Sequence, residues 1–342
     1  MSTNLAMDVK GLGKDYTRRL RQPGLWGAVR GLVSSEYENV PAVQSISFQI
    51  KRGEQVGLIG ENGAGKSTTV KMLCGILLPS RGNLEVLGLI PWKQRRQLAA
   101  RIGVVFGQKP QLLWDIPVRE TFVLLREMYG IPPAIYAKTL PKVTDLLDLE
   151  PLLSSPVRQL SLGQRMRCDL AAAVLHAPDL AFLDEPTIGL DVVAKQQARE
   201  LIKWLAREFG STLVLTTHDL KDITETCGRV ILLDKGGVLF DGSLKSFESR
   251  FAGERRVVAE LEKPLSPAVA SRLRARLKPL KLREAEWSGQ RVALASSKQP
   301  ALNKAAALLL ATGSVAELDF ERTEVEEIVR RIYVKKKAPH AV

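Results

Sequence analysis

The sequence predicts an α/β protein whose core is a parallel sheet, followed by a smaller α+β domain. Short apolar runs at 102–106, 180–183 and 213–216 alternate with helical segments, which is the order typical of a parallel α/β core. A glycine-rich stretch at 60–68 directly follows another such run. Beyond Phe251 the order of elements changes to βαββαβ, which indicates a second fold.

The chain carries a strong positive charge. It has 342 residues, enough for about two domains, with 50 Lys and Arg against 37 Asp and Glu, a formal net charge of +13. This excess favours polyanionic partners, whether nucleotides, nucleic acid or the anionic face of a membrane. The basic clusters lack the interleaved aromatic residues of a groove for single strands, and ordinary solvated surface also accounts for them.

Cysteine usage and hydropathy predict a cytosolic protein. Cys74, Cys168 and Cys227 lie far apart without a C-x-x-C pair, which argues against a disulfide framework and against a zinc site. No apolar run approaches the ~20 residues of a membrane-spanning helix, and the first residues hold no signal-peptide core. We therefore expect the chain to stay in a reducing cytosol and not to cross a bilayer.

The first 50 residues predict two strands separated by an insertion. Residues 5–10 alternate weakly and lead to Tyr16, which indicates an edge strand ending in an exposed aromatic. The pattern then breaks from about 17 to 39, where prolines, glycines and basic residues favour an inserted excursion with a short amphipathic helix at 26–33. Strand alternation resumes at 43–50.

The remaining core elements follow from local periodicity. We expect strands at 54–59, 82–87, 102–106, 180–183, 213–216 and 230–233, and helices at 69–77 and 92–100. Between 117 and 153 the period turns helical, with Pro132, Pro133 and Pro141 as breaks. A mostly α subdomain is therefore predicted at about 110–175.

The C-terminal part predicts a ferredoxin-like domain. Strands are expected at 255–262, 282–287, 291–295 and 315–320, and helices at 266–277 and 301–311. A final helix at 323–333 begins with a capping box, Thr323 and Glu326. We place the domain boundary at 250, with a nucleotide-binding domain at 1–250 and an accessory α+β domain at 251–342.

The stretch 60–68 fits G-x-x-x-x-G-K-[ST] between a buried strand and a helix start, which is the context that a phosphate-binding loop requires. Glycines let successive backbone N–H groups turn around a phosphate chain, and the new helix points its positive end at it. Lys66 adds a charge near the β and γ phosphates, and the Ser67 hydroxyl can hold Mg²⁺. A glycine-rich turn that binds nothing is the alternative.

Two carboxylates, Asp184 and Glu185, end the apolar run at 180–183. An acidic residue at the tip of a parallel strand beside a phosphate loop can complete Mg²⁺ coordination, and Asp184 is expected to do so. Glu185 can orient or deprotonate a water that attacks the γ-phosphate. Taken without the phosphate loop, the pair would be read as a helix cap or a solvated turn.

A second anion site is predicted where Ser161 and Gly163 precede a helical run at 165–176. A Ser-x-Gly pair before a helix is also a common N-cap. His218 follows the strand at 213–216, and Gln108 follows the strand at 102–106. Each could be purely structural, but both stand at ends of core strands.

With these motifs in this order, residues from about 5 to 245 resemble the nucleotide-binding subunit of an ATP-binding cassette (ABC) transporter. The resemblance implies a P-loop NTPase core with an antiparallel β edge and a helical subdomain. It assigns nucleotide contacts to Tyr16, Gly60, Asn62, Gly63, Ala64, Gly65, Lys66, Ser67, Thr68, Ser161, Gly163, Gln164 and Asp191. Catalysis is assigned to Glu185, His218 and Gln108, and metal contact to Ser67, Gln108 and Asp184.

Two departures from the family pattern stand out. Leu162 replaces the first glycine of the usual Leu-Ser-Gly-Gly-Gln signature, although Ser161 and Gly163 are kept, so activity is expected. Tyr16, the aromatic expected to stack on adenine, lies far from the phosphate loop because of the insertion, and Phe48 or Tyr37 could take its place.

The resemblance also implies a mode of action. Two ATP-binding subunits, identical or paralogous, would close head to tail on ATP and Mg²⁺ and drive a separate membrane permease from the cytoplasmic face of the membrane. The segments 161–167 and 185–191 resemble bacterial ABC-2 type exporter ATPases, which suggests export of a drug-like, lipid or polyketide compound. An importer, or a soluble ABC ATPase acting on nucleic acid or ribosomes, is the alternative; we expect no nucleic acid. The C-terminal domain could bind a regulator, help dimerise or brace the core.

Overall fold

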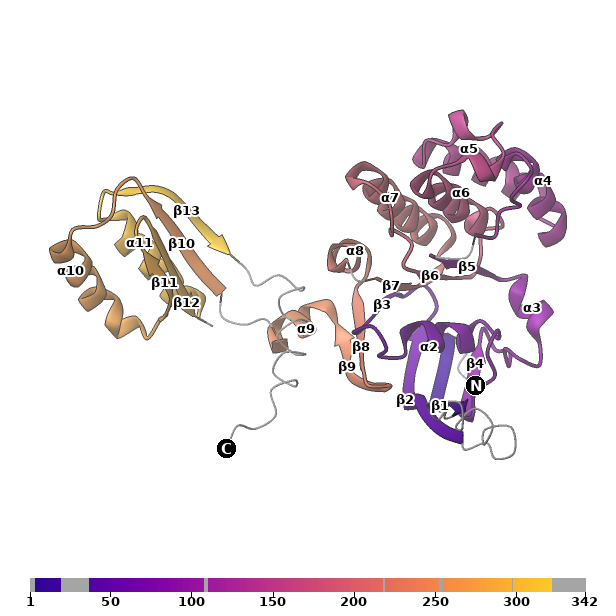
Figure 1. Cartoon of the computed structure of the whole chain (residues 1–342), viewed down its shortest axis with the longest axis horizontal. Coiled ribbons are helices and arrows are strands. Elements are labelled where there is room, and N and C mark those ends of the chain that lie inside the picture. Colours follow the sequence, from indigo (N-terminus) through magenta and orange to yellow (C-terminus); the bar gives the residue numbers. More distant parts are fainter. Residues whose placement is uncertain are drawn as a thin grey trace, which may run out of the picture. The chain divides into compact units, whose positions relative to one another are not determined.

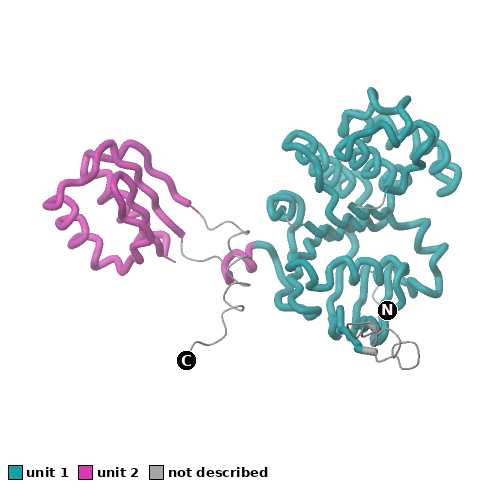
Figure 2. Tube along the Cα trace, viewed as in Figure 1, with its two compact units in different colours: residues 1–244 teal, residues 245–342 magenta. Residues whose placement is uncertain are grey.

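The computed structural model describes residues 4–19, 37–107, 110–217, 219–251, 255–296 and 298–321. The chain divides into two compact units, 1–244 and 245–342 (Figure 2). The division falls at the start of helix α9 (Leu244–Phe251), a few residues before the boundary expected from the sequence.

A three-stranded antiparallel sheet opens unit 1, with strands in the order β2-β1-β4. Its members are β1 (Leu5–Arg19), β2 (Tyr37–Lys51) and β4 (Arg81–Val86). The expectation that the first strand is an edge strand is wrong, because β1 pairs with β2 on one side and with β4 on the other.

The predicted insertion is narrower than the sequence indicated. Strands β1 and β2 stay paired as far as Arg19 opposite Tyr37, so 17–19 and 37–39 belong to the sheet. The amphipathic helix predicted at 26–33 lies outside the described residues.

The second sheet of unit 1 has six strands in the order β5-β6-β7-β3-β8-β9. Its strands are β3 (Gln55–Ile59), β5 (Ile102–Phe106), β6 (Leu180–Asp184), β7 (Thr212–Thr216), β8 (Arg229–Asp234) and β9 (Gly237–Ser243). All its pairings are parallel except that of β8 with β9. The predicted parallel core is confirmed, while β9 was missed because its run Gly237–Ser243 has only one buried residue, Phe240.

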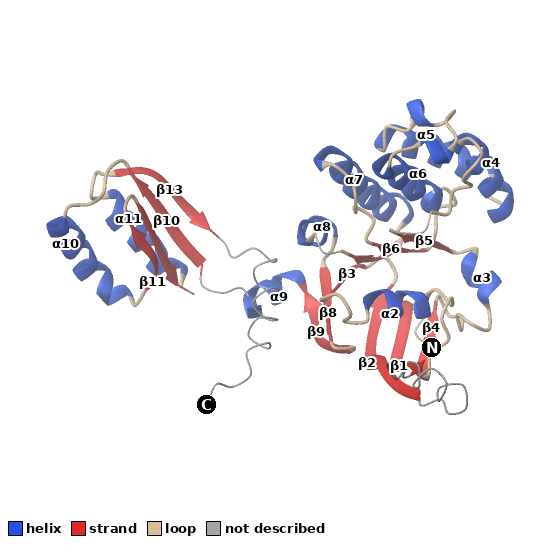
Figure 3. Cartoon of the chain, viewed as in Figure 1, coloured by secondary structure: helices blue, strands red, loops and turns tan. Residues whose placement is uncertain are grey.

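Helices cover both faces of the six-stranded sheet (Figures 1 and 3). On one side α2 (Lys66–Leu73) lies between the two sheets, and one hydrophobic core joins residues from both sheets and this helix. Among its described residues, the unit also contains the α-helices α3 (Arg95–Ala99), α4 (Val118–Tyr129), α5 (Pro133–Leu146), α6 (Leu162–Val174), α7 (Val192–Phe209) and α8 (Leu220–Thr226). Helices α4 to α7 gather on the side opposite α2.

Helix α5 corrects one predicted break. Pro132 and Pro133 start the helix as expected, but Pro141 lies inside it. A proline in a helix interior normally breaks the helix. Here the flanking Thr139 and Val143 are both fully buried, and the Thr139 hydroxyl donates to Leu175 O of the neighbouring chain segment at 2.8 Å. Tertiary packing therefore holds the helix across the proline.

Unit 2 has the predicted ferredoxin-like topology, with strands in the order β11-β12-β10-β13, all antiparallel. Its elements are β10 (Arg255–Leu261), α10 (Pro267–Leu277), β11 (Arg283–Ser288), β12 (Arg291–Ser296), α11 (Gln299–Leu310) and β13 (Val315–Glu321). The unit has a hydrophobic core of its own, in which Val257 and Leu294 of the sheet meet Leu273 and Leu302 of the helices. The last predicted helix, 323–333, lies outside the described residues.

Within the ranges that the structure describes, none of the helices combines the length and apolar character needed to cross a bilayer.

Candidate nucleotide-binding site

The phosphate-binding loop connects the end of β3 to the start of α2. Gly65 is the N-cap of α2 and has a left-handed φ of 101°. A Cβ at Gly65 would lie 2.7 Å from the carbonyl oxygen of Ala42, so the position requires glycine for both conformation and space. Neither a side-chain cap nor an acidic residue occupies the first turn of α2. The positive end of the helix is thus open to an anion.

The rest of the loop packs against β8 on one side and is exposed to solvent on the other. A Cβ at Gly60 would meet the Leu233 carbonyl oxygen at 2.6 Å, so the loop starts tightly against β8. Ala64 is buried and donates its N–H to Glu61 O at 3.0 Å. By contrast Asn62, Gly63 and Ser67 are exposed, and Thr68 is half-buried.

Lys66 lies almost buried at the centre of the loop, with 8% of its surface exposed. Its Nζ donates to Gly60 O at 2.7 Å and to Glu61 O at 3.2 Å. Burial lowers the pKa of this ammonium, while the carboxylates of Glu185 and Asp184 act in the opposite direction. The two acidic residues at the end of β6 therefore lie near enough to Lys66 to influence its charge.

Asp184 connects the phosphate loop to the end of β7. Its Oδ1 accepts a hydrogen bond from the Thr216 hydroxyl and another, at 3.3 Å, from the Ser67 hydroxyl. Asp184 is itself buried, with 8% of its surface exposed. A carboxylate beside a hydroxyl at a phosphate loop is a set of hard oxygen ligands that suits Mg²⁺, which takes its remaining ligands from phosphate and water. The described residues contain no group of three or more His, Cys, Asp and Glu that could hold a metal without such help.

Glu185 has an unusual backbone. Its φ is 56°, in the left-handed region that non-glycine residues rarely occupy. Its N–H donates to Thr216 O at 2.9 Å, and its carbonyl accepts from Ile188 N at 3.3 Å. These bonds make the chain turn sharply at the end of β6, directly beside Asp184.

The second predicted anion site begins helix α6. Ser161 is the N-cap and forms a capping box with Gln164: the Ser161 Oγ accepts from Gln164 N at 3.2 Å, and Gln164 Oε1 accepts from Ser161 N at 2.9 Å. Leu162, which departs from the family signature, has 55% of its surface exposed. A Cβ at Gly189 would lie 2.8 Å from Leu162 Cδ2, so the leucine covers that glycine.

Asp191 caps the next helix. Its Oδ1 accepts from Ala194 N at 2.8 Å at the start of α7. Gly163 lies close to the same turn, because a Cβ there would meet Gly189 O at 3.1 Å. The structure thus places Gly163, in the first turn of α6 after its N-cap Ser161, beside the turn at Gly189 that leads to Asp191.

Tyr16 lies near the end of β1, where it pairs with Val40 of β2 and has 42% of its surface exposed. Ala42, two positions further along β2, contacts the phosphate loop at Gly65. Phe48 is 6% exposed and belongs to the core, so little of its ring is open for stacking on adenine. The side chain of Tyr37 lies outside the described residues. Tyr16 is therefore better placed than Phe48 for an adenine ring.

Gln108 and His218 lie outside the described residues, but their neighbours are described. Gly107 donates its N–H to Asp184 O at 2.9 Å. The Thr217 hydroxyl accepts from Asp219 N at 3.0 Å. Since Asp184 also binds Thr216, the strand ends leading to both residues meet at the end of β6.

Sequence reasoning missed several polar residues at these strand ends. Thr216 donates to Asp184, and the fully buried Asp222 accepts from Thr187 and Thr217. The threonines at 216 and 217 were visible beside His218, but nothing in the spacing of Asp222 shows that α8 buries it.

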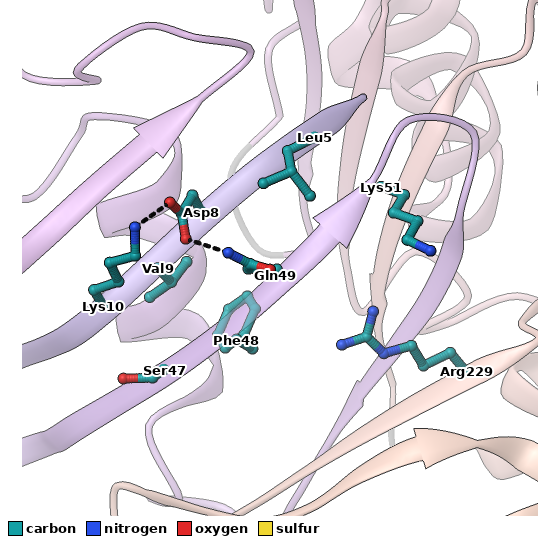
Figure 4. A pocket seen from close by; sticks show the side chains of 9 residues that line it. All are labelled: Leu5, Asp8, Val9, Lys10, Ser47, Phe48, Gln49, Lys51 and Arg229. Atoms are coloured by element: carbon teal, nitrogen blue, oxygen red, sulfur yellow. Dashed lines mark hydrogen bonds and ion pairs between the residues drawn. The ribbon is translucent and has the colours of Figure 1, made fainter. Parts of the chain in front are cut away.

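A pocket of about 490 Å³ lies elsewhere, lined by residues of β1 and β2 together with Arg229 of β8 (Figure 4). Several of its polar groups have partners: Asp8 accepts from Lys10 at 2.6 Å and from Gln49 at 3.1 Å, and Arg229 pairs with Asp241. The hydrogen bonds from Lys10 and Gln49 hold the pKa of Asp8 below its usual range. Of the residues that line this pocket, only Phe48 was considered for nucleotide contact, as the alternative to Tyr16.

A parallel sheet with a phosphate loop at the end of β3 and two carboxylates at the end of β6 defines a P-loop nucleotide-binding protein. Comparison with known proteins gives the family. A sequence profile for the family "ABC transporter" matches residues 43–188. The chain is 33% identical to the ABC transporter ATP-binding protein NatA of Bacillus subtilis (strain 168), over 60% of this chain and 84% of that protein.

Further relatives agree with this result. The linearmycin resistance ATP-binding protein LnrL of Bacillus subtilis (strain 168) is 31% identical, over 65% of this chain and 71% of that protein. The Nod factor export ATP-binding protein I of Neorhizobium galegae is 37% identical, over 61% of this chain and 60% of that protein.

Solved structures show the same fold. An ATP-binding subunit of an ABC transporter superimposes with a TM-score of 0.61 at 28% identity, covering 72% of this chain and 93% of the other. The cassette MJ0796, in a dimeric post-hydrolysis state with ADP and Pi, gives a TM-score of 0.57 at 25% identity, covering 70% and 98%. The chain belongs to the ATP-binding subunits of ABC transporters, and it is an ATPase. The predicted family, fold class and enzymatic activity are confirmed.

Proposed function

We propose that this chain powers the export of a small molecule through a separate membrane permease. The observation that carries the catalytic part is the convergence of Lys66, Ser67, Asp184 and Glu185 where β3 and β6 end. Support for export comes from relatives named for Nod factor export and for linearmycin resistance. A drug-like, lipid or polyketide cargo fits these names, and import is the alternative.

ATP would bind with its phosphates inside the loop 60–68. The open first turn of α2 supplies N–H groups, and Lys66 supplies a positive charge near the terminal phosphates. Tyr16 is proposed to stack on the adenine, since its ring is exposed on a strand whose partner contacts Gly65.

Mg²⁺ would be held by Ser67 and Asp184, whose oxygens already lie 3.3 Å apart, with Gln108 as a third contact. The ion would neutralise charge on the phosphates when bound. The protein would keep the carboxylate of Asp184 oriented for the ion. The Thr216 hydroxyl contributes to this by donating to Asp184 Oδ1, the oxygen that also accepts from Ser67.

Glu185 is the proposed general base. The sharp turn at φ 56° directs the chain out of β6 immediately after Asp184, beside the phosphate loop. A carboxylate there can accept the proton of a water in line with the γ-phosphate. His218, which follows Thr217 at the end of the neighbouring strand β7, is proposed to assist on the γ-phosphate.

A second ATP-binding subunit would complete the site. The starts of α6 and α7 meet where Gly163 lies beside Gly189, and we propose that this surface closes on ATP held by the other subunit. Its contacts would come from Ser161, Gly163, Gln164 and Asp191. The dimeric state of the related cassette MJ0796 supports this arrangement. Attachment to the cytoplasmic face of the membrane would follow from binding to the permease.

Glu185→Gln tests the catalytic proposal. The amide keeps the size of the side chain but cannot accept the proton, so kcat should fall by at least about 100-fold, while ATP binding persists. An ATP-bound dimer should accumulate in size-exclusion chromatography with ATP and Mg²⁺. Undiminished hydrolysis would remove Glu185 from the role of base.

The transport proposal needs a separate test. The chain and its permease, reconstituted in vesicles with the ATP site facing outward, should move a labelled cargo into the lumen when ATP is added outside, since that direction corresponds to export. ATP-driven movement of the cargo out of the lumen would indicate import instead. The Glu185→Gln variant serves as the matched control without turnover.

A further inference from the structure

A buried ion pair lies behind the ends of β6 and β7. Asp222 of α8 has 0% of its surface exposed, and Arg199 of α7 has 4% exposed. Arg199 Nε donates to Asp222 Oδ1 at 2.7 Å. Removing water from two charges is costly, so a pair this deep persists only when its remaining hydrogen-bonding capacity is satisfied.

Two threonine hydroxyls satisfy the other oxygen of Asp222. Thr187 Oγ1 donates to Oδ2 at 2.6 Å, and Thr217 Oγ1 donates to the same oxygen at 3.3 Å. Thr187 follows β6 and Thr217 follows β7. One carboxylate thus joins three segments that are distant in sequence: the turn after β6, the end of β7 and helix α7.

The turn after β6 needs such support. Glu185, two residues before Thr187, has a left-handed φ of 56°. A non-glycine residue held in this region costs on the order of 1–3 kcal/mol and persists only where the surroundings fix it. Thr187 is 2% exposed, and its carbonyl accepts from Leu190 N at 3.2 Å, so its side chain and backbone both brace the turn.

We propose that Asp222 is a positioning residue, which fixes Glu185 through Thr187 relative to the end of β7. This inference rests on the proposed role of Glu185 as the general base. Arg199 orients the carboxylate of Asp222, and this carboxylate accepts the hydrogen bond of the Thr187 hydroxyl. Thr187 in turn fixes the backbone turn that directs Glu185 toward the nucleotide. Neither Asp222 nor Thr187 touches the reacting atoms.

Thr187→Val tests the link without breaking the buried ion pair. Valine has nearly the same shape but no hydroxyl, so the turn loses its tie to Asp222 while Arg199 keeps its partner. We expect kcat for ATP hydrolysis to fall about 10- to 100-fold, with the KM for ATP unchanged within about twofold. Thr187→Ser keeps the hydroxyl and should restore most of kcat.

Thr139→Val is the matched control. Thr139 is equally buried, and its hydroxyl donates to Leu175 O at 2.8 Å in the helical subdomain, away from the strand ends. This variant loses a comparable hydrogen bond and should keep wild-type kcat. Asp222→Asn should lower kcat as well, and adding Thr187→Val to it should produce little further loss, because both act through one contact.

Three outcomes would overturn the proposal: wild-type kcat in Thr187→Val, an equal loss in Thr139→Val, or failure of serine to rescue. Glu185→Gln measured in parallel separates this proposal from the one on which it rests. If Glu185→Gln abolishes turnover and Thr187→Val does not, Glu185 is the base but Asp222 does not position it. If Glu185→Gln remains active, the base assignment itself fails.

Discussion

Gly65 shows how tightly single residues constrain the phosphate loop. Its φ of 101° belongs to a region that glycine alone enters easily, and the space for a side chain is taken by the Ala42 carbonyl oxygen at 2.7 Å. The phosphate loop is thus built against the antiparallel sheet as well as against β3. A side chain at this residue would push the loop away from the sheet that also carries Tyr16.

Gly65→Ala should therefore weaken ATP binding by at least about tenfold and lower the free energy of unfolding by about 1–3 kcal/mol. Nucleotide titration and urea unfolding would measure the two effects. Gly228→Ala is the control, since nothing lies within 4 Å of the added Cβ there and its φ is not in the left-handed region. Equal affinities in the two variants would contradict the steric argument.

Single residues also mark the limit of sequence reasoning. The residues of the phosphate loop and the pair Asp184 and Glu185 could be predicted because their spacing along the chain is itself the signal. Asp222 and Arg199 could not, because their pairing depends on the packing of α7 against α8, and a buried carboxylate looks like an exposed one in a sequence.

Helix α6 is tied to the segment that precedes α4. Asp169 is 6% exposed, and its Oδ1 accepts a hydrogen bond from Gln111 N at 3.0 Å. The guanidinium carbon of Arg165 lies 4.4 Å from the centre of the Trp114 ring. Burial raises the pKa of Asp169 to about 6, although hydrogen bonds from the amides of Gln111 and Leu112 oppose this. Helix α6 therefore carries a carboxyl group with a pKa of about 6.

This raised pKa predicts a pH-dependent stability. A carboxyl whose pKa is higher in the folded state stabilises the fold when protonated, and it loses that contribution as the pH rises through about 6. Asp169→Asn keeps an acceptor for the amide but does not titrate. From pH 8 to pH 5 the wild type should gain about 1–2 kcal/mol of unfolding free energy relative to this variant.

Chemical denaturation of both proteins at several pH values would measure the difference. Comparing the two chains cancels the contribution of other groups, including His176, whose pKa burial lowers to about 4 in both. The His176 ring stacks on the Tyr129 ring, with 4.2 Å between the ring centroids. A stability difference that stays constant with pH would contradict the prediction.

Elements were predictable where their own residues determine them. The bounds of β5 match the expected 102–106, because five apolar residues between polar turns leave little choice. The central place of β1 and the continuation of α5 through Pro141 could not be predicted, because both depend on distant partners: β4 pairs with β1, and the Leu175 carbonyl accepts from Thr139.

Each of the two units has its own hydrophobic core. We predict that a chain ending at Phe251 folds and hydrolyses ATP at a rate within about threefold of the full chain, because every described residue of the proposed site lies before it. ATPase assays and thermal unfolding would test this. An inactive but folded product would show that 252–342 contributes to catalysis.

The sequence predicted the type of each sheet and unit, but not the order of the strands within the sheets. Alternating strands and helices indicated a parallel sheet, and βαββαβ indicated the ferredoxin-like unit, since each pattern is local. The order β5-β6-β7-β3-β8-β9 is set by contacts between distant segments, and no local pattern encodes it.

That strand order affects how the protein folds during its synthesis on the ribosome. Strand β3 is made early, but it lies between β7 (Thr212–Thr216) and β8 (Arg229–Asp234), which are made much later. At typical rates of synthesis the apolar segment 55–59 waits roughly 10–30 s for its neighbours. Until then its apolar residues lack the two strands that flank them, and the sheet that carries the phosphate loop is incomplete. Nucleotide can therefore stabilise only a nearly finished first unit.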